Sequence, residues 1–468
     1  MEFKLLTSNK LLPRARCLSL LGLSSNKKQA MQIHAQMITN SLFHGTEAVV
    51  ELMESYFSVQ EGEEYARLVF WNSDEAVKNA SAWSFFIQRC HLFESLPLYA
   101  LQIRLGVMPD KVSSICVLRA CARSLALREG VQIHAQVFKA GLASDMAVQT
   151  TGIHFYGSCR DIESACQMFD EMRERSCVTW NTMMSAYCAS ERPREALELF
   201  NRMRREGVKP TERTVLPLMS ACAQLGELDK GTAVHAFICK AIVDYHQDLF
   251  IGTELVDMYS KCGSLSNASK VFEGMAQRNV LAWTAMTAGL AMHGKGQEAL
   301  RMLESMQEHG IIPNVVTFTC LLAACCHAGL VQEGLHLFEL MPIKFGLKPQ
   351  VQHYSCIVDL LGRTGMIEEA YNVIRNMPIE PDAVVWRALL SACKMHDHVD
   401  LAAEAAGKLL QIEQTSPALD SSQDFIALSN VYASAERWDD VLMVRKAMMN
   451  LSIQNKPGFS SVNVHKLD

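Results

Sequence analysis

The chain has 468 residues, about half of them apolar and a fifth charged, and its net charge is −6. This composition excludes a disordered protein and predicts extensive buried surface. The negative charge provides no general attraction to nucleic acid, so any RNA or DNA contact has to be confined to one strip of surface. The 16 cysteines include no Cys-x-x-Cys spacing, which disfavours a zinc site or disulfide framework and indicates reduced, buried thiols.

Two segments raise the question of targeting and membranes. Residues 1–25 carry four basic residues and one acid among several leucines and serines. This is typical of an organelle transit peptide, although an ordinary basic N-terminus has the same composition. The longest uncharged stretch, residues 310–332, is long enough to cross a bilayer but contains Pro313, Asn314, His327 and Gly329. We therefore predict a turn followed by a buried helix instead of a membrane span.

A three-residue pattern recurs along the chain. A small residue is followed four positions later by a bulky residue and three later by Met or a similar residue, as in Ala165, Phe169 and Met172. This spacing places the three side chains on one face of an α-helix. The small residue recurs at positions 130, 165, 196, 231, 268, 299, 334 and 370, in steps of 31–37 residues. Such a period is characteristic of a solenoid.

Each repeat is expected to contain two helices. In residues 177–211, the first helix would carry Trp180, and a break would follow at residues 190–193. The second helix would begin near Arg194 and end near Gly207, with Pro210 beyond it. One helical hairpin cannot bury its apolar face, whereas a stack of hairpins can. We therefore predict an all-α fold, a right-handed α-α superhelical solenoid of helix-turn-helix repeats whose first helices line a concave groove.

The segment VTWNTMMSAYCASERPREALELFNRMRREGVKP, residues 178–210, resembles a pentatricopeptide repeat. The alternating lengths of 35, 35–37 and 31 residues resemble those of the plant PLS subfamily. On this resemblance, degenerate repeats occupy residues 26–79, and residues 383–468 are an E-type extension that is shortened at its end. The repeats between them would span residues 80–110, 111–145, 146–176, 177–211, 212–248, 249–279, 280–314, 315–350 and 351–382.

Many members of this family end in a DYW-type domain, which resembles a cytidine deaminase. Its chemistry needs a His-x-Glu and a Cys-x-x-Cys motif, and this sequence has neither. We therefore expect no enzymatic activity, no cofactor and no metal site. His34, His134 and His235 recur about a hundred residues apart, and we interpret them as core residues instead of metal ligands.

Two other recurring sets of residues are interpreted as packing residues. The tryptophans have an alternative role as platforms on which bases stack. The two sets are Cys121, Cys222, Cys325 and Cys393, and Trp83, Trp180, Trp283 and Trp386.

The resemblance implies binding of single-stranded RNA, with one base read by each repeat. In the family, the fifth and the last residue of a repeat hydrogen-bond the base edge, and the second residue packs beside the base. Carried over to this sequence, the RNA-binding pairs are Ser84 with Asp110, Thr150 with Ser176, Asn181 with Thr211, Thr253 with Asn279, Thr284 with Asn314, and Ser355 with Asp382.

Other positions of the repeats qualify this assignment. Val178 and Leu281 at second positions would be wedges beside bases, whereas Ile115 and Leu216 at fifth positions cannot hydrogen-bond a base. The alternative for the polar pairs is that they only cap helices. By the family's code, the legible bases from 5′ to 3′ are a pyrimidine, an unread base, A, A, an unread base and G.

The resemblance implies a site-recognition factor for C-to-U RNA editing in an organelle, with the mitochondrion preferred and the chloroplast as the alternative. The E-type extension would recruit a separate DYW-type deaminase. Stabilisation, processing or splicing of organellar RNA is an alternative within the same class. A protein–protein scaffold is a different class, which the negative charge favours and the unequal repeat lengths disfavour, because tetratricopeptide scaffolds have a fixed period of 34 residues.

Overall fold

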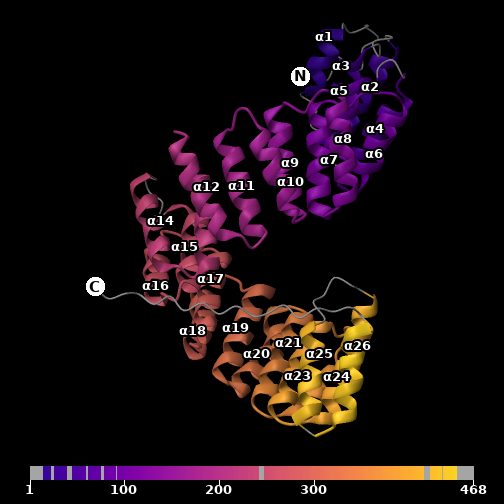
Figure 1. The fold of residues 1–468 in the computed structure, drawn as a ribbon. Coiled ribbons are helices and arrows are strands. Elements are labelled where there is room, and N and C mark those ends of the chain that lie inside the picture. The colour runs from indigo at the N-terminus through magenta and orange to yellow at the C-terminus, as the bar shows by residue number, and fades with distance from the viewer. Residues whose placement is uncertain are drawn as a thin grey trace. The chain divides into compact units, whose positions relative to one another are not determined.

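The computed structural model describes residues 14–22, 26–39, 45–59, 62–74, 78–90, 92–241, 247–415, 422–434 and 436–450. Within these residues the regular secondary structure is entirely helical. The chain divides into two compact units, residues 1–224 and 225–468, and Figure 1 shows each as a succession of paired helices. The predicted all-α fold is therefore confirmed.

The first unit contains the following helices, of which the last extends one residue into the second unit: α1 (Arg14–Gly22), α2 (Lys27–Thr39), α3 (Thr46–Ser58), α4 (Glu63–Asn72), α5 (Ala80–Arg89), α6 (Leu92–Arg104), α7 (Lys111–Ser124), α8 (Leu127–Lys139), α9 (Met146–Ser158), α10 (Ile162–Glu171), α11 (Cys177–Ala189), α12 (Pro193–Arg205), the short 3-10 helix η3 (Glu212–Thr214) and α13 (Val215–Leu225).

The second unit contains these helices: α14 (Leu228–Ala241), α15 (Leu249–Lys261), α16 (Leu265–Gly274), α17 (Val280–Met292), α18 (Gly296–Glu308), α19 (Val315–Ala328), α20 (Val331–Phe345), α21 (Val351–Arg363), α22 (Ile367–Arg375), α23 (Ala383–Met395), α24 (Val399–Thr415), α25 (Ser422–Ser434) and α26 (Trp438–Asn450).

Within each unit the helices form two layers. The odd-numbered helices are the first helices of the repeats, and successive ones pack side by side, as α7 does with α9 and α17 with α19. Within a unit, an even-numbered helix packs against the first helix of its own repeat and often against that of the next, as α10 does with α9 and α11. This is the predicted solenoid of helix-turn-helix repeats.

The repeat at residues 177–211 shows why the chain turns where it does. Helix α11 ends at Ala189, and α12 begins with Pro193 at its first position, where the missing N–H would have no helical partner. Helix α12 ends at Arg205, and Gly207 has a φ of 76°, a conformation that glycine adopts without steric cost. The break and the end predicted for this hairpin are confirmed.

Small residues allow neighbouring helices to approach closely. A Cβ added to Gly130 would lie 2.0 Å from the ring of Phe155, and Ala196 is fully buried. Trp180 is also fully buried, and its ring meets Phe169 edge to face at a centroid distance of 5.0 Å. Because Trp83, Trp283 and Trp386 are buried too, the tryptophans are packing residues and not platforms for bases.

The recurring histidines are less enclosed than expected. His34, His134 and His235 are half-buried, and the Nδ1 atom of each lies 2.8–3.0 Å from a tyrosine hydroxyl of the following helix. Burial lowers the pKa of His34 and His134, which favours a neutral ring whose Nδ1 can accept a hydrogen bond from the tyrosine hydroxyl. The recurring cysteines are fully buried as predicted, and all 16 cysteines have free thiols.

The structure describes part of the predicted transit peptide. Residues 14–22 form α1, which contacts α2 and α3 and buries Cys17, Leu20 and Leu21. A peptide cleaved after residue 25 would remove this helix from the solenoid. Residues 1–13, and residues 451–468 of the predicted extension, lie outside the described residues.

The uncharged stretch forms the predicted turn and helix. Gly310 has a φ of 70°, and α19 begins after Asn314. Among the described residues, no helix is both long enough and apolar enough to span a membrane.

Candidate functional site

An apolar side chain is exposed at the second position of six first helices. These side chains are not part of the core, and their recurrence at one position marks a candidate contact surface. The six, with exposed fractions of 40–73%, are Val112, Val178, Phe250, Leu281, Val316 and Val384. Sequence reasoning named two of them as wedges and missed the other four, which the repeat register alone could have identified.

The last residue of a repeat caps the first helix of the next one. Asp110, Ser176, Asn279, Asn314 and Asp382 each accept a hydrogen bond from a backbone N–H at the start of the following helix, with distances of 2.9–3.3 Å. These residues therefore do cap helices. A carboxylate or carboxamide has a second polar atom, however, so capping leaves those side chains one group for another contact.

Three predicted pairs are joined by oxygen contacts. Ser84 donates to the carboxylate of Asp110 directly. The hydroxyls of Thr150 and Ser176 each lie 3.0 Å from the hydroxyl of Thr179. Thr284 and Asn314 are joined in the same way through Thr317, at 2.8 and 3.0 Å.

A thiol joins the pair Asn181 and Thr211. The Sγ atom of Cys177 lies 3.7 Å from Asn181 Nδ2 and 3.4 Å from Thr211 Oγ1. Because sulfur is a weak donor and acceptor, this link holds the two side chains less firmly than a hydroxyl would.

Two predicted pairs are not joined. Within the described part of the chain, no hydrogen bond connects Thr253 with Asn279 or Ser355 with Asp382. Thr253 donates to the carbonyl of Leu249 at 2.6 Å, and Asn279 and Asp382 cap α17 and α23.

In two of the joined pairs the bridging residue, Thr179 or Thr317, is the third residue of the next repeat, a position that sequence reasoning missed. Ser113, Thr179, Thr214, Thr317 and His353 occupy this position, and all are fully buried. They were missed because a bridge joins side chains from two repeats, which no pattern within one repeat reveals.

His353 reveals a further polar pair in the repeat at residues 315–350. Its Nδ1 accepts from the backbone N–H of Gln350 at 3.0 Å, and its Nε2 lies 3.2 Å from the hydroxyl of Thr319. Thr319 and Gln350 are the fifth and last residues of that repeat. Its fifth residue is therefore polar, unlike Ile115 and Leu216 in the repeats of the same type.

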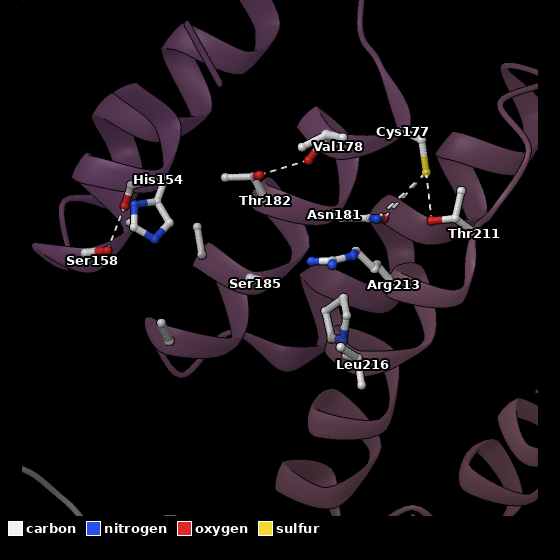
Figure 2. A pocket seen from close by; sticks show the side chains of 14 residues that line it. His154, Ser158, Cys177, Val178, Asn181, Thr182, Ser185, Thr211, Arg213 and Leu216 are labelled. Carbon is white, nitrogen blue, oxygen red and sulfur yellow. Dashed lines mark hydrogen bonds between the residues drawn. The ribbon is translucent and has the colours of Figure 1, made fainter. Parts of the chain in front are cut away.

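A pocket of about 470 Å³ lies on the first-helix layer of the first unit, between α9, α11 and the segment around η3. Val178, Asn181 and Thr211 line it, as do Arg213 and Leu216 of the next repeat. Figure 2 shows the Arg213 guanidinium directed into the pocket beside Asn181. The predicted wedge and the predicted pair of this repeat thus share one pocket.

The surroundings of this pocket are positively charged despite the net charge of the chain. Burial, and then the cations of Arg119 and Arg123, lower the pKa of His154, which lines the pocket. The side chains of Arg119, Arg123 and Arg213 are exposed. The pocket therefore combines an apolar wall, hydrogen-bonding groups and nearby cations, which suits a planar polar ring attached to an anionic backbone.

Family models match along much of the chain. The model described as the PPR repeat family matches residues 175–224 and 278–327, and that described as the PPR repeat matches 153–177, 253–280, 316–344 and 353–379. The E motif model matches residues 396–463, which fall within the predicted extension.

Curated relatives match almost the whole chain. The pentatricopeptide repeat-containing protein At3g18970 of Arabidopsis thaliana is 40% identical, over 96% of this chain and 99% of its own length. The chain belongs to the pentatricopeptide repeat family. A second pentatricopeptide repeat relative from the same plant, At1g59720, chloroplastic/mitochondrial, is 37% identical over 96% of this chain and 72% of its own length.

Solved structures of pentatricopeptide repeat proteins share the fold. The crystal structure of PPR10 in complex with an 18-nt psaJ RNA element matches with a TM-score of 0.63 and 17% identity. The match covers 91% of this chain and 64% of that chain, so this chain spans less than two thirds of the length of PPR10 in that structure.

Proposed function

We propose that this pentatricopeptide repeat protein binds single-stranded RNA and reads one base with each competent repeat. The pocket of residues 177–211 is the observation that carries this proposal. A base in it would pack against Val178 and meet Asn181 and Thr211 with its edge. The guanidinium of Arg213 would lie on the other side, where a planar cation can stack on the ring.

The same arrangement supports reading by other repeats. The exposed apolar residues at second positions, such as Phe250 and Leu281, are placed to separate successive bases. The repeats at residues 177–211, 249–279, 280–314 and 315–350 each combine an exposed apolar second residue with a polar pair at the fifth and last positions. The base order proposed for the target remains a pyrimidine, an unread base, A, A, a base facing Thr319 and Gln350, and G.

We propose that the biological role is site recognition for C-to-U editing in an organelle. The E motif and relatives whose names include chloroplastic or mitochondrial support this role, with the mitochondrion preferred. The chain would position the RNA without catalysing the reaction, and residues 383–468 would recruit a DYW-type deaminase that acts in trans.

Two experiments test this function at different levels. Filter binding with a pool of randomised single-stranded RNAs should select a motif, and affinity should fall with salt by a slope equal to only a few phosphates, each contributing roughly 0.7. Failure to retain RNA would favour a protein scaffold.

Sequencing of organellar RNA with and without the protein should reveal one or more cytidines whose editing is lost without it. Changed transcript ends or splicing with intact editing would assign the protein to RNA processing.

A further inference from the structure

Thr317 connects the two groups proposed to read a base in the repeat at residues 280–314. Its hydroxyl is fully buried and lies 2.8 Å from that of Thr284, which is only 8% exposed. The same hydroxyl lies 3.0 Å from Asn314 Oδ1, which also accepts the backbone N–H of Thr317 at 2.9 Å. Three side chains from two repeats thus form one short network.

The number of protons in this network determines which atoms donate. Asn314 Oδ1 can only accept, so the single hydroxyl proton of Thr317 is directed to it. The proton of Thr284 has two acceptors, the carbonyl of Val280 and the hydroxyl of Thr317, which lie 2.7 and 2.8 Å from Thr284 Oγ1, so this proton stays within the network. Thr284 therefore offers a lone pair to a base, and Asn314 offers the N–H groups of Nδ2.

The preceding repeat has the same reading pair without this network. Thr253 and Asn279 occupy its fifth and last positions, but Ala282 occupies the bridging position. Asn279 Oδ1 accepts only backbone N–H groups, at 3.1 Å, and Thr253 donates to Leu249. The Thr253 hydroxyl can therefore reverse its direction at the cost of a single hydrogen bond.

We propose that Thr317 is a positioning residue for base selection, and that it makes the repeat at residues 280–314 more selective for adenine over guanine than the repeat at 249–279. This inference rests on the proposed function. Adenine offers a donor at N6 and an acceptor at N1, which complement an acceptor at Thr284 and a donor at Asn314. Guanine offers the opposite arrangement, an acceptor at O6 and a donor at N1, which the Thr253 hydroxyl can accommodate by giving up its one hydrogen bond to Leu249.

The test uses the full chain and a pool of single-stranded RNAs randomised over a stretch longer than the repeat array. Selection defines the bound motif. Titrations with RNAs varied at one base then measure, for each of the two repeats, the ratio of the affinity for A to the affinity for G, called the A-to-G ratio below. In Thr317→Val, which keeps the side-chain shape but removes the hydroxyl, this ratio should fall about threefold to tenfold, the worth of one hydrogen bond. Ratios at the other bases should not change.

Three further variants separate positioning from a loss of structure. Thr317→Ser retains the hydroxyl and should keep the wild-type ratio. Thr287→Val is the matched control, because Thr287 is equally buried and its hydroxyl donates only to the carbonyl of Trp283 at 2.8 Å. Ala282→Thr introduces the missing hydroxyl and should sharpen the A-to-G ratio at the base read by residues 249–279.

The outcomes distinguish this inference from the function on which it rests. If the wild-type protein selects no motif from the pool, the proposed function is overturned together with the inference. If it selects a motif and folded Thr317→Val keeps the full ratio, only the inference is overturned. Should Thr317→Val lose its helical circular dichroism, the Ala282→Thr ratio decides, and an unchanged value overturns the inference.

Discussion

The repeats at residues 177–211 and 280–314 have the same length and begin 103 residues apart. Their cores contain the same type of aromatic contact. Trp180 meets Phe169 edge to face at 5.0 Å, and Trp283 meets Phe272 at 4.9 Å.

The junctions that precede the two repeats also agree. The guanidinium of Arg175 donates to the carbonyl of Phe169 at 3.0 Å and lies over its ring. Arg278 does the same with Phe272, at 2.8 Å. The interior of the repeat is thus built in the same way in both units.

The exposed surfaces of the two repeats differ. A thiol of Cys177 joins Asn181 to Thr211, whereas a buried hydroxyl of Thr317 joins the reading pair of the other repeat. The second residue of the next repeat also differs: it is Arg213 after the repeat at 177–211 and Val316 after the repeat at 280–314. The packed core is thus repeated in both repeats, whereas the contacts around the proposed reading pair differ.

The largest expected effect tests whether the two cores are equivalent. Trp180→Ala and Trp283→Ala should each destabilise the protein by about 3–5 kcal/mol, because each removes a large buried ring. Chemical denaturation followed by circular dichroism measures this. Trp438→Ala on α26, where the side chain is 63% exposed, is the control and should change stability by less than about 0.5 kcal/mol. Unequal losses of stability in Trp180→Ala and Trp283→Ala would show that the two cores are not equivalent.

A smaller effect is expected from Asn314→Asp. One carboxylate oxygen can continue to cap α19, so stability should be kept, while the other replaces the outward amide donor with an acceptor. Preference at that base should shift from A toward G by about 1–3 kcal/mol, the value of a good bidentate base contact. Titrations with RNAs varied at this base measure it, with Asn201→Asp on α12 as the charge-matched control. An unchanged preference would contradict RNA reading by this repeat.

The second residues of the repeats that follow the two compared repeats, Arg213 and Val316, should respond differently. Arg213→Ala should weaken RNA binding by about 0.5–2 kcal/mol through lost stacking of a cation on the base, and the loss should vanish on an RNA with an abasic nucleotide at that position. Arg204→Ala, which removes an exposed charge from α12, is the control. Val316→Ala should weaken binding without altering the salt dependence. A loss for Arg213→Ala that persists on abasic RNA would mean that Arg213 contacts only phosphate.

The smallest effect concerns pH. Because the pKa of His154 is lowered, the ring is neutral at pH 7 and gains a proton only as the pH falls below about 6.5. RNA affinity should therefore rise on acidification, by no more than about fivefold, the effect of one charge near 4 Å in water. His154→Gln should remove the rise. Asp257, at the same position of the repeat at 249–279, pairs with Lys261, so Asp257→Asn should leave the pH dependence unchanged.

The sequence by itself determined the helical solenoid, the hairpin of residues 177–211 and the burial of its tryptophan. These features follow from spacings within one or two helices, where the 3.6-residue period and the turn residues act locally. The reading pairs came from the family resemblance. Their capping role was also open to sequence reasoning, because Asn, Asp and Ser are strong N-cap residues.

Only the tertiary structure decided how those side chains are connected. Thr317 meets Thr284, and Thr179 meets Thr150, across 33 and 29 residues of sequence, so their contacts depend on how one repeat stacks on the next. The direction of Arg213 into the pocket and the tyrosine partners of the half-buried histidines have the same origin. A sequence period specifies which face of a helix is buried, whereas hydrogen bonds between repeats depend on distances that only packing sets.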